Sequence, residues 1–573
     1  MEEEPGCSLE KRFSFKRSED CIEEDLDHPK TKGFFFDRGR LKKTCTFTDS
    51  RIEIVDIEEG RIKKTFDVKE YFDDDTFKIE CVTPLDIDPH KTTPPGLVPD
   101  RFIFPLLLVG CSYSAGGMLL VLATYVDNPV RIVKIPYKVT AICPITVENT
   151  TPTSPIVFPP SLHILSGTIA IGTQCGIVYL MELQRDTFLL AYQSLEPRDP
   201  LDLLIREFPD LDTTEKVEAA QDDLAAHIAI PLNAVSQHNG LFYIQLPNNK
   251  ICMKRFQQED VYVSALHVIE EANLLVVAYL LRKHCEIEGE VYVYKNVFQL
   301  WDLSRLEIIF TSGLWDACEV THLSHQVASD DPYASLYLHV ACRTIDDEYA
   351  SPFMLLYDCR FEQKDTSESV ARFSGFVECC KKFEWYMSTP ELPHGRLLSL
   401  SKLPPGPEDK QIVSYLTTMY SAHSDSYRVL LYLFDLNQWF SAQMPDEYSA
   451  RSGPRYTAQH DLTQVLDARS LPISIDIIQS PDNVFICKNP RIQFDSFYHP
   501  NAYSFRSNCL LESEIVCVSH LGVHEKLVKL MTHGRASCLL APEQYFNFAV
   551  RLHLQPLFME PLTVNHRLEE YSA

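Results

Sequence analysis

Short apolar runs, broken by Pro, Asn, Asp and Gly, follow one another from Cys45 onward, and long helical periodicities are rare. Runs of this length and spacing are typical of all-β proteins. The uncharged stretch between Arg101 and Asp127 is long enough to cross a bilayer. Pro105 and the turn-forming segment 112–117 divide it into two runs of strand length. The pattern therefore predicts a buried hairpin here and no transmembrane segment.

Two sequence elements recur along the chain. The first is an apolar run that ends in a bulky residue, an acid and a small apolar residue, at 52–57, 178–183, 298–303, 354–359 and 431–436. The second, Val-Ser/Thr-x-Ile/Leu, begins at Val139, Val263 and Val320. The second element precedes the acid of the first by about 40 residues, the length of a four-stranded propeller blade.

This repeat predicts an all-β protein, a β-propeller of about seven divergent WD-like blades. Six or eight blades and a pair of packed sandwiches are the alternatives, since the Gly-His half of the usual repeat is missing. The residues expected to carry the structural blade signature are Asp56, Trp301, Asp302, Asp358 and Asp435.

The pattern also suggests how the chain is divided. Residues 1–31 alternate charge blocks, KRFSFKR and then EDCIEEDLDH, and are expected to form a disordered tail. Residues 32–540 are assigned to the propeller. Within it, Asp199 precedes apolar residues at helical spacing, including Leu204 and Ile205, so an acidic helical insertion is expected over 196–230. Residues 541–573 are expected to be a C-terminal extension, the truncated start of a helical region.

Composition narrows the function. The formal net charge is −27, and a field of that sign repels a phosphate backbone, so no direct DNA binding is expected from this chain. The 18 cysteines are scattered and include no CxxC pair, which favours reduced thiols in an intracellular protein. The acidic N-terminus lacks the apolar run of a signal peptide.

Motifs for catalysis or cofactor binding are missing: there is no Walker loop, dinucleotide fingerprint, HExxH or GxSxG. In a strand, His322 and His325 would point to opposite faces, and His520 and His524 would lie too far apart to share a metal ion. The basic run 38–43 and the acidic run 73–75 are expected to be solvated loops. We therefore expect no enzyme, no cofactor, no metal and no small-molecule substrate.

One segment is too aromatic for an ordinary loop. It follows the strand that ends at Asp435, and Trp and Met beside polar residues can form a binding hot spot. The alternative is that the tryptophan packs under its own blade as a local core. The candidate partner-binding residues are Trp439, Phe440, Gln443, Met444, Pro445 and Asp446.

Three stretches resemble the N-terminal propeller region of the ELYS family of nucleoporins. They are FDLNQWFSAQMPD at 434–446, the stretch 263–303 with VSALHVIEEANLLVVAY and VFQLWDL, and YHPNAYSFRSNCLLESEIVCVSHLGVHEKL at 498–527. The resemblance is clear from about Val261 onward, whereas the first half matches only in strand pattern.

The resemblance implies a non-enzymatic propeller that docks onto the Y-shaped nucleoporin complex at the nuclear pore and nuclear envelope. In the family a helical solenoid and a tail with AT-hook DNA-binding segments follow, so the chain is expected to be either a fragment or a short paralogue that keeps the docking module. A scaffold of a cytoplasmic coat or trafficking complex is the alternative, because propellers share a fold without sharing partners. A propeller-type hydrolase or sugar-binding protein would need ionisable residues on several first strands, where only His322 occurs.

Overall fold

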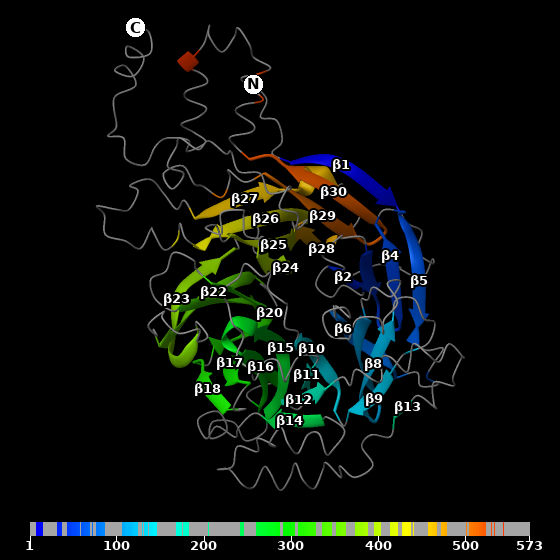
Figure 1. The fold of residues 1–573 in the computed structure, drawn as a ribbon, viewed down its shortest axis with the longest axis vertical. Helices are drawn as coiled ribbons and strands as arrows, with labels where there is room; N and C mark the ends of the chain where they lie inside the picture. Colours follow the sequence, from blue (N-terminus) through cyan, green and yellow to red (C-terminus); the bar gives the residue numbers. More distant parts are fainter. Residues whose placement is uncertain are drawn as a thin grey trace, which may run out of the picture. The chain divides into compact units, whose positions relative to one another are not determined.

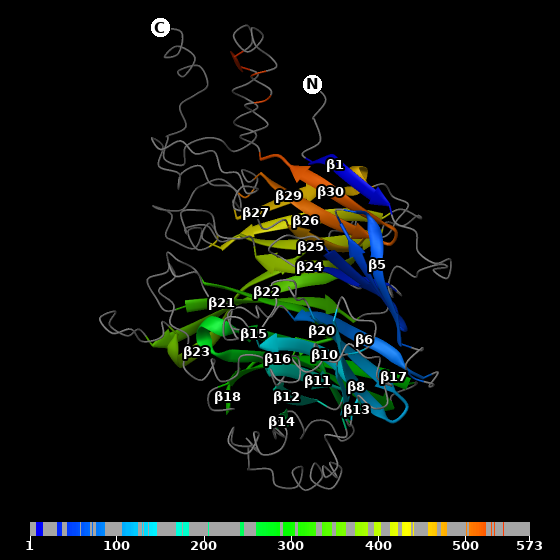
Figure 2. The ribbon, with the colours of Figure 1, turned by 45° about the vertical axis from the view of Figure 1, so that its right-hand side comes forward.

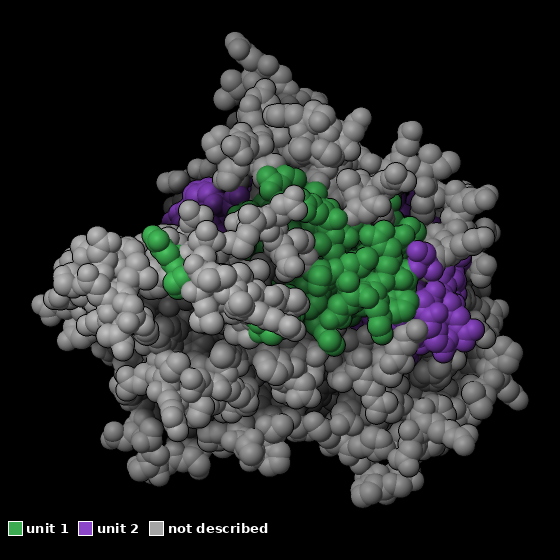
Figure 3. Space-filling model, turned by 90° about the horizontal axis from the view of Figure 1, so that it is seen from above, with its two compact units in different colours: residues 1–13, 328–330, 398–573 green, residues 14–327, 331–397 purple. Residues whose placement is uncertain are grey.

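The chain divides into two compact units, which Figure 3 distinguishes by colour. The larger unit comprises residues 14–327 and 331–397, and the smaller unit comprises residues 1–13, 328–330 and 398–573. The computed structural model describes residues 7–14, 31–36, 43–57, 59–68, 72, 76–85, 106–123, 129, 131–135, 137–145, 168–174, 176–182, 204–205, 241–245, 259–286, 290–303, 307–313, 315–327, 335–345, 351–362, 373–387, 395–402, 413–421, 427–436, 439, 456–466, 472–477, 500, 504–522, 529, 532 and 542–543.

Five sheets of four or five strands make up the described part of the larger unit, and almost all of their strands pair antiparallel with the next strand in sequence (Figure 1). The first sheet contains β2 (Lys32–Phe36), β3 (Lys43–Phe47), β4 (Arg51–Asp56) and β5 (Arg61–Asp67). The second contains β6 (Lys78–Leu85), β7 (Leu106–Tyr113), β8 (Gly116–Ala123), β9 (Arg131–Ile135) and β13 (Leu204–Ile205). The third contains β10 (Val139–Ile145), β11 (Thr168–Thr173), β12 (Ile177–Glu182) and β14 (Leu241–Gln245).

The fourth and fifth sheets have the longest strands. The fourth contains β15 (Glu259–Ile269), β16 (Leu274–Glu286), β17 (Glu290–Asp302), β18 (Glu307–Thr311) and β19 (Trp315–Asp316), with the 3-10 turn η2 (Glu270–Ala272) between β15 and β16. The fifth contains β20 (Cys318–Val327), β21 (Ser335–Thr344), β22 (Pro352–Glu362) and β23 (Ser374–Tyr386).

The described part of the smaller unit belongs mainly to two sheets, whose strands also include Ser14 and residues 395–397 of the larger unit. One contains β24 (Gly395–Lys402), β25 (Val413–Ser421), β26 (Tyr427–Asp435) and β27 (Thr457–Asp461), followed by the short helix α8 (Thr463–Leu466). The other combines β1 (Cys7–Ser14) from the N-terminus with β28 (Pro472–Ile477), β29 (Phe505–Leu511) and β30 (Glu514–His520). Figure 2 shows β1 beside β30, in line with their pairing in the sheet order.

The predicted fold class is confirmed: the described chain is a series of small antiparallel sheets of propeller type. The predicted hairpin is also confirmed, because β7 and β8 pair from Leu106 with Ala123 to Tyr113 with Gly116. Among the described residues no helix is long and apolar enough to cross a membrane.

Two expectations about local structure are wrong. Residues Cys7–Ser14 form strand β1 instead of belonging to a disordered tail, because the last sheet offers them the edge of β30 for backbone pairing. Leu204 and Ile205 form a two-residue strand rather than a helical turn, because they pair parallel with Ile132 and Val133 at the edge of β9. The rest of the predicted insertion 196–230, and of the extension 541–573 apart from 542–543, lies outside the described residues.

Buried side chains on both faces of each sheet hold the larger unit together. Leu107 and Val109 of β7 pack in a cluster with the first sheet, whereas Leu106 and Leu108 pack in a cluster with the third. On β11, Ile171 belongs to the cluster shared with the second sheet. Alternation along a strand therefore serves two neighbours at once, and central strands are apolar at nearly every position.

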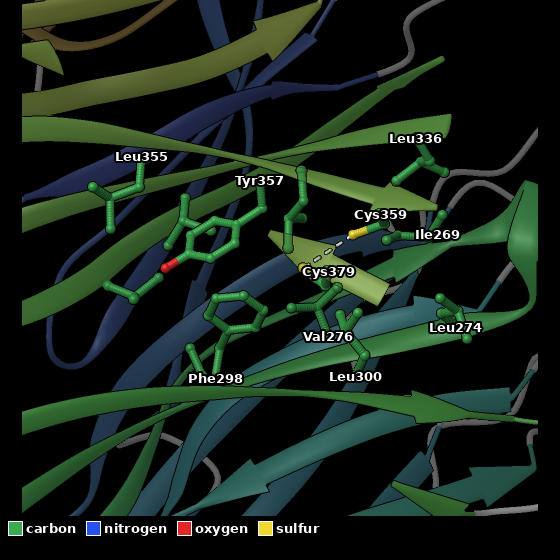
Figure 4. Packing of buried hydrophobic residues seen from close by; sticks show 14 of the residues in the cluster. Ile269, Leu274, Val276, Phe298, Leu300, Leu336, Leu355, Tyr357, Cys359 and Cys379 are labelled. Carbon is green, nitrogen blue, oxygen red and sulfur yellow. Dashed lines mark hydrogen bonds between the residues drawn. The ribbon is translucent and has the colours of Figure 1, made fainter. Parts of the chain in front are cut away.

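The same pattern continues to the last sheet of this unit. Phe298 of β17 and Tyr357 of β22 meet edge to face with their ring centroids 5.0 Å apart (Figure 4). Both belong to one cluster with Leu300 and Leu355. Each sheet of the larger unit thus completes the core of the next, as the blade hypothesis predicted.

The repeated Val-Ser/Thr element has a structural role in the first strands. The pairing register skips one residue after Val139, Val263 and Val320 of β10, β15 and β20, so each element contains a β-bulge. The bulged Thr140 donates its hydroxyl hydrogen to the carbonyl of Val263 in the next sheet, over 2.7 Å. Thr83 of β6, outside the three copies of the element, makes a similar bond to the carbonyl of Ile142, over 3.2 Å. In the other two copies the hydroxyl does not reach the next sheet: Thr321 donates to Ala341 of its own sheet over 3.3 Å, and the hydroxyl of Ser264 is buried without a hydrogen-bond partner among the described residues. The bulge is therefore common to all three copies, whereas the hydroxyl bond to the next sheet is made at Thr140 only.

Close approach between sheets requires glycine on the second strand. A Cβ atom built on Gly172 of β11 would lie 2.5 Å from Cγ1 of Val263, and one on Gly110 of β7 would lie 2.6 Å from Cγ1 of Val139. Both valines belong to the repeated element. Glycine and valine thus form a matched pair across the sheet interface.

We predict that Gly172→Ala lowers the free energy of unfolding by about 1–3 kcal/mol, because the methyl group overpacks the contact with Val263. Gly313→Ala is the matched control, since its Cβ would meet no atom within 4 Å, and it should change stability by less than about 0.5 kcal/mol. Urea unfolding of both variants measures this. Equal losses at the two positions would contradict the account of the sheet contact.

Candidate interaction surface

The predicted partner segment is described only at its start. Trp439 is 4% exposed and is therefore buried. The strand before it ends at Asp435, whose backbone N–H donates to the carbonyl of Tyr456 over 2.8 Å. Phe440, Gln443, Met444, Pro445 and Asp446 lie outside the described residues. A buried Trp439 offers little area to a partner, so the hot-spot hypothesis now depends on the residues that follow it, and it stays a prediction.

Three of the five predicted signature residues occupy strand ends. Asp56, Asp302 and Asp435 are the last residues of β4, β17 and β26. The side chain of Asp56 accepts the backbone N–H of Glu59 over 3.1 Å and thereby caps the turn to β5. Trp301 is 4% exposed and packs in the core between the third and fourth sheets. These positions fit a structural role.

Asp358 departs from this pattern because it lies inside β22 rather than at its end. Its carboxylate is buried and accepts Nε of Arg360 over 3.0 Å, with Nζ of Lys382 3.6 Å away. This interaction raises the pKa of Arg360. The negative charge of Asp358 is therefore compensated by Arg360 and Lys382 of the same sheet.

A hydrogen-bonded chain joins the fourth and fifth sheets. Nε2 of His325 donates to a carboxylate oxygen of Glu271 over 2.8 Å. Its Nδ1 is then the acceptor for Nε2 of His267, 2.7 Å away. The sequence did not predict this hydrogen-bonded series, because its three residues come from β15, η2 and β20 and do not recur at a regular spacing.

The other histidines that the sequence singled out are His322, His520 and His524. Among the described residues no group of three His, Cys, Asp or Glu side chains could hold a metal ion. Burial lowers the pKa of His322 to about 4. Burial also holds the pKa of His520 well below its usual value, and its Nε2 lies 2.7 Å from the hydroxyl of Ser507. His524 lies outside the described residues, as do the runs 38–42 and 73–75.

Several cysteine thiols are in environments that make them poor nucleophiles. The sulfur atoms of Cys359 and Cys379 lie 3.4 Å apart across β22 and β23, as the dashed line in Figure 4 shows. The hydrogen bond from Cys359, together with burial, raises the pKa of Cys379 far above its usual value. Burial raises the pKa of Cys81 and Cys143 to about 12. Thiols in this state are poor nucleophiles.

Two exposed apolar side chains lie at opposite ends of β23, the outermost strand of the fifth sheet. Val377 is 59% exposed and Tyr386 is 58% exposed. Between them Lys381 forms an ion pair with Glu384 over 3.0 Å. We call Val377, Lys381, Glu384 and Tyr386 the β23 surface. The sequence did not reveal it, since apolar residues on an outer strand have the same alternation as those on a covered one.

The edge of β23 is itself irregular. Its pairing with β22 shifts register three times, and Gly375 has a φ of 69° that a side chain would strain. Bulges break the regular row of backbone groups on an edge strand. The β23 surface therefore exposes side chains rather than an open strand edge.

Buried neutral histidine makes stability depend on pH. Burial lowers the pKa of His339 from 6.5 to about 3, and its Nε2 lies 3.0 Å from the amide oxygen of Gln326. Above pH 6.5 this histidine is neutral in both the folded and the unfolded chain. As pH falls from 6.5 toward 3, only the unfolded chain takes up the proton, so stability falls.

We predict that His339→Gln makes the free energy of unfolding less dependent on pH. Below pH 6.5, the variant should lose about 1.4 kcal/mol less than the original protein for each pH unit. Urea unfolding at pH 7.5 and pH 5.5 measures the difference for both proteins. Parallel pH profiles would show that His339 is not held neutral by burial.

Comparison with known proteins gives the same family as the sequence motifs. No family model matches the chain. The chain is 24% identical to human "Protein ELYS" over 486 residues, 79% of this chain and 19% of that protein. It is 22% identical to Xenopus laevis "Protein ELYS" over 461 residues, 75% of this chain and 17% of that protein. It spans about a fifth of the length of these curated relatives.

Solved structures add little to this. The Chaetomium thermophilum Nup170 N-terminal domain in complex with Nup53 aligns with a TM-score of 0.46 at 11% identity, covering 96% of this chain and 66% of that one. A TM-score below 0.5 does not establish a shared fold.

The alignment with the human protein covers 79% of this chain, which is more than the stretch from Val261 to the C-terminus. The similarity therefore extends into the first half of the chain, beyond strand pattern alone. The predicted resemblance is confirmed: over most of its length this chain is similar to Protein ELYS.

Proposed function

We propose that this chain is a non-enzymatic protein-interaction module of the nuclear pore complex. It docks onto the Y-shaped nucleoporin complex and supports pore assembly at chromatin and the nuclear envelope. The observation that carries this proposal is the similarity to Protein ELYS over 79% of the chain. The first stretch that suggested the family, 434–446, includes the predicted partner segment.

The chemistry of the described residues supports a binding role. His267 and His325 are engaged in hydrogen bonds, and burial raises the pKa of Cys81 and Cys143. Sheets that share their cores form a rigid support for loops. In such a module, affinity comes from a few desolvated side chains rather than from total area.

The charge of the chain constrains how it works near chromatin. With a net charge of −27, it repels DNA over the range of the Debye length. Association with chromatin therefore runs through protein partners.

We predict that the tagged chain, expressed in cells, gives a nuclear-rim signal that coincides with Y-complex nucleoporins. Vesicular puncta would instead support the coat or trafficking scaffold. Diffuse cytoplasmic signal would contradict both.

We predict that Gln443→Ala combined with Met444→Ala weakens co-precipitation of Y-complex nucleoporins by about 30-fold, the loss of a hot spot worth about 2 kcal/mol. These two positions leave the buried Trp439 in place, so the thermal transition should stay unchanged. Val377→Ala combined with Tyr386→Ala on the β23 surface is the matched control. Loss of binding in the control, but not in the loop variant, would move the docking site to β23.

A further inference from the structure

The N-terminal strand is the least anchored element of its sheet. β1 is the outermost strand and pairs with β30. Its described side chains from Ser8 to Arg12 are exposed, Phe13 is half-buried and Ser14 is exposed. Leu9 is 49% exposed. Because none of these side chains is buried in the core, β1 is held mainly by backbone pairing, and such strands open locally more easily than the sheet behind them.

Ion pairs supplement that pairing. The guanidinium of Arg12 lies 3.4 Å from a carboxylate oxygen of Glu514 on β30 and donates to the carbonyl of Val465 over 3.3 Å. The carboxylate of Glu10 lies 2.9 Å from Nε of Arg506 on β29. These pairs are partly exposed, so each contributes little and is sensitive to competing charge.

The end of this strand has an unusual sequence. Ser14 follows Lys11, Arg12 and Phe13 and precedes Phe15, in the basic block KRFSFKR. Kinases that select serine after basic residues do so with acidic side chains in their peptide groove, because opposite charges steer and align the substrate. A serine at the exposed end of a loosely held strand, two residues after an arginine, combines this charge pattern with access.

We propose that Ser14 is a phosphorylation site for a serine kinase of the basic-residue-directed class, and that its phosphate facilitates the release of β1 from β30. The serine oxygen attacks the γ-phosphorus of ATP. The new O–P bond forms as the bond from that phosphorus to the β–γ bridging oxygen breaks. ADP leaves, and the hydroxyl proton passes to a carboxylate of the kinase.

The charge of the phosphate explains the release. Residues two apart in a strand face the same side, so the phosphate on Ser14 lies near the side chain of Arg12. At neutral pH it carries about −1.5 to −2 charges and binds guanidinium more strongly than a single carboxylate does. Arg12 then turns from Glu514 to its own strand, and β1 loses one of the ion pairs that supplement its backbone pairing with β30.

The test uses the full chain, ATP and the catalytic domain of a basic-residue-directed serine kinase, with sites located by mass spectrometry. The expected result is phosphate on Ser14, lost in Ser14→Ala and retained in Ser8→Ala. Ser8 is the matched control because it is exposed on the same strand, but no basic residue stands before it. Phosphate on Ser18 or Ser8 in place of Ser14 would overturn the assignment. So would an unmodified chain under conditions in which a peptide of residues 8–20 is modified.

Release is measured separately by hydrogen exchange. After phosphorylation, the amides of Glu514–His520 in β30 should exchange roughly two- to fivefold faster, as expected from the loss of one partly exposed ion pair. The amides of β21, in the larger unit, are the internal reference and should not change. Unchanged exchange in β30 of the phosphorylated chain would overturn the release.

Discussion

Burial of both faces of each sheet is the constraint on which the rest of the larger unit depends. A four-stranded sheet of this size, exposed on its own, would leave the apolar side chains of both its faces in water. Here Leu106 and Leu107, neighbours on β7, pack into two different clusters with two different sheets. Successive side chains of one strand thus pack against two different sheets. Each sheet thereby stabilises the sheets before and after it.

This constraint explains which parts of the structure the sequence could predict. The repeated Val-Ser/Thr element is visible as a pattern because the first strand has a β-bulge at the same place in each copy, after Val139, Val263 and Val320. The acid of the other element was visible for a similar reason, as the turn cap at Asp56 illustrates. Features that repeat along a chain can be found without coordinates.

Features that occur once could not be found in this way. The chain from Glu271 through His325 to His267 joins three elements that only the packing of two sheets brings together. The strand at Cys7–Ser14 was mistaken for a tail because its partner, β30, lies at the other end of the sequence, with Arg12 and Val465 453 residues apart. The helix expected around Leu204 failed because a free strand edge outweighed helical spacing. At Trp439, burial favours the local core that was the alternative to a contact residue.

The shared cores imply that the larger unit unfolds cooperatively. Sheets that bury their apolar side chains against one another cannot open one at a time. Native-state hydrogen exchange in low concentrations of denaturant measures this directly on the second strands β7, β11, β16 and β21. The account predicts that their slowest amides share one free energy of opening, equal to that of global unfolding of the unit. A sheet whose second strand opens at a clearly lower free energy, while its neighbours remain protected, would contradict it.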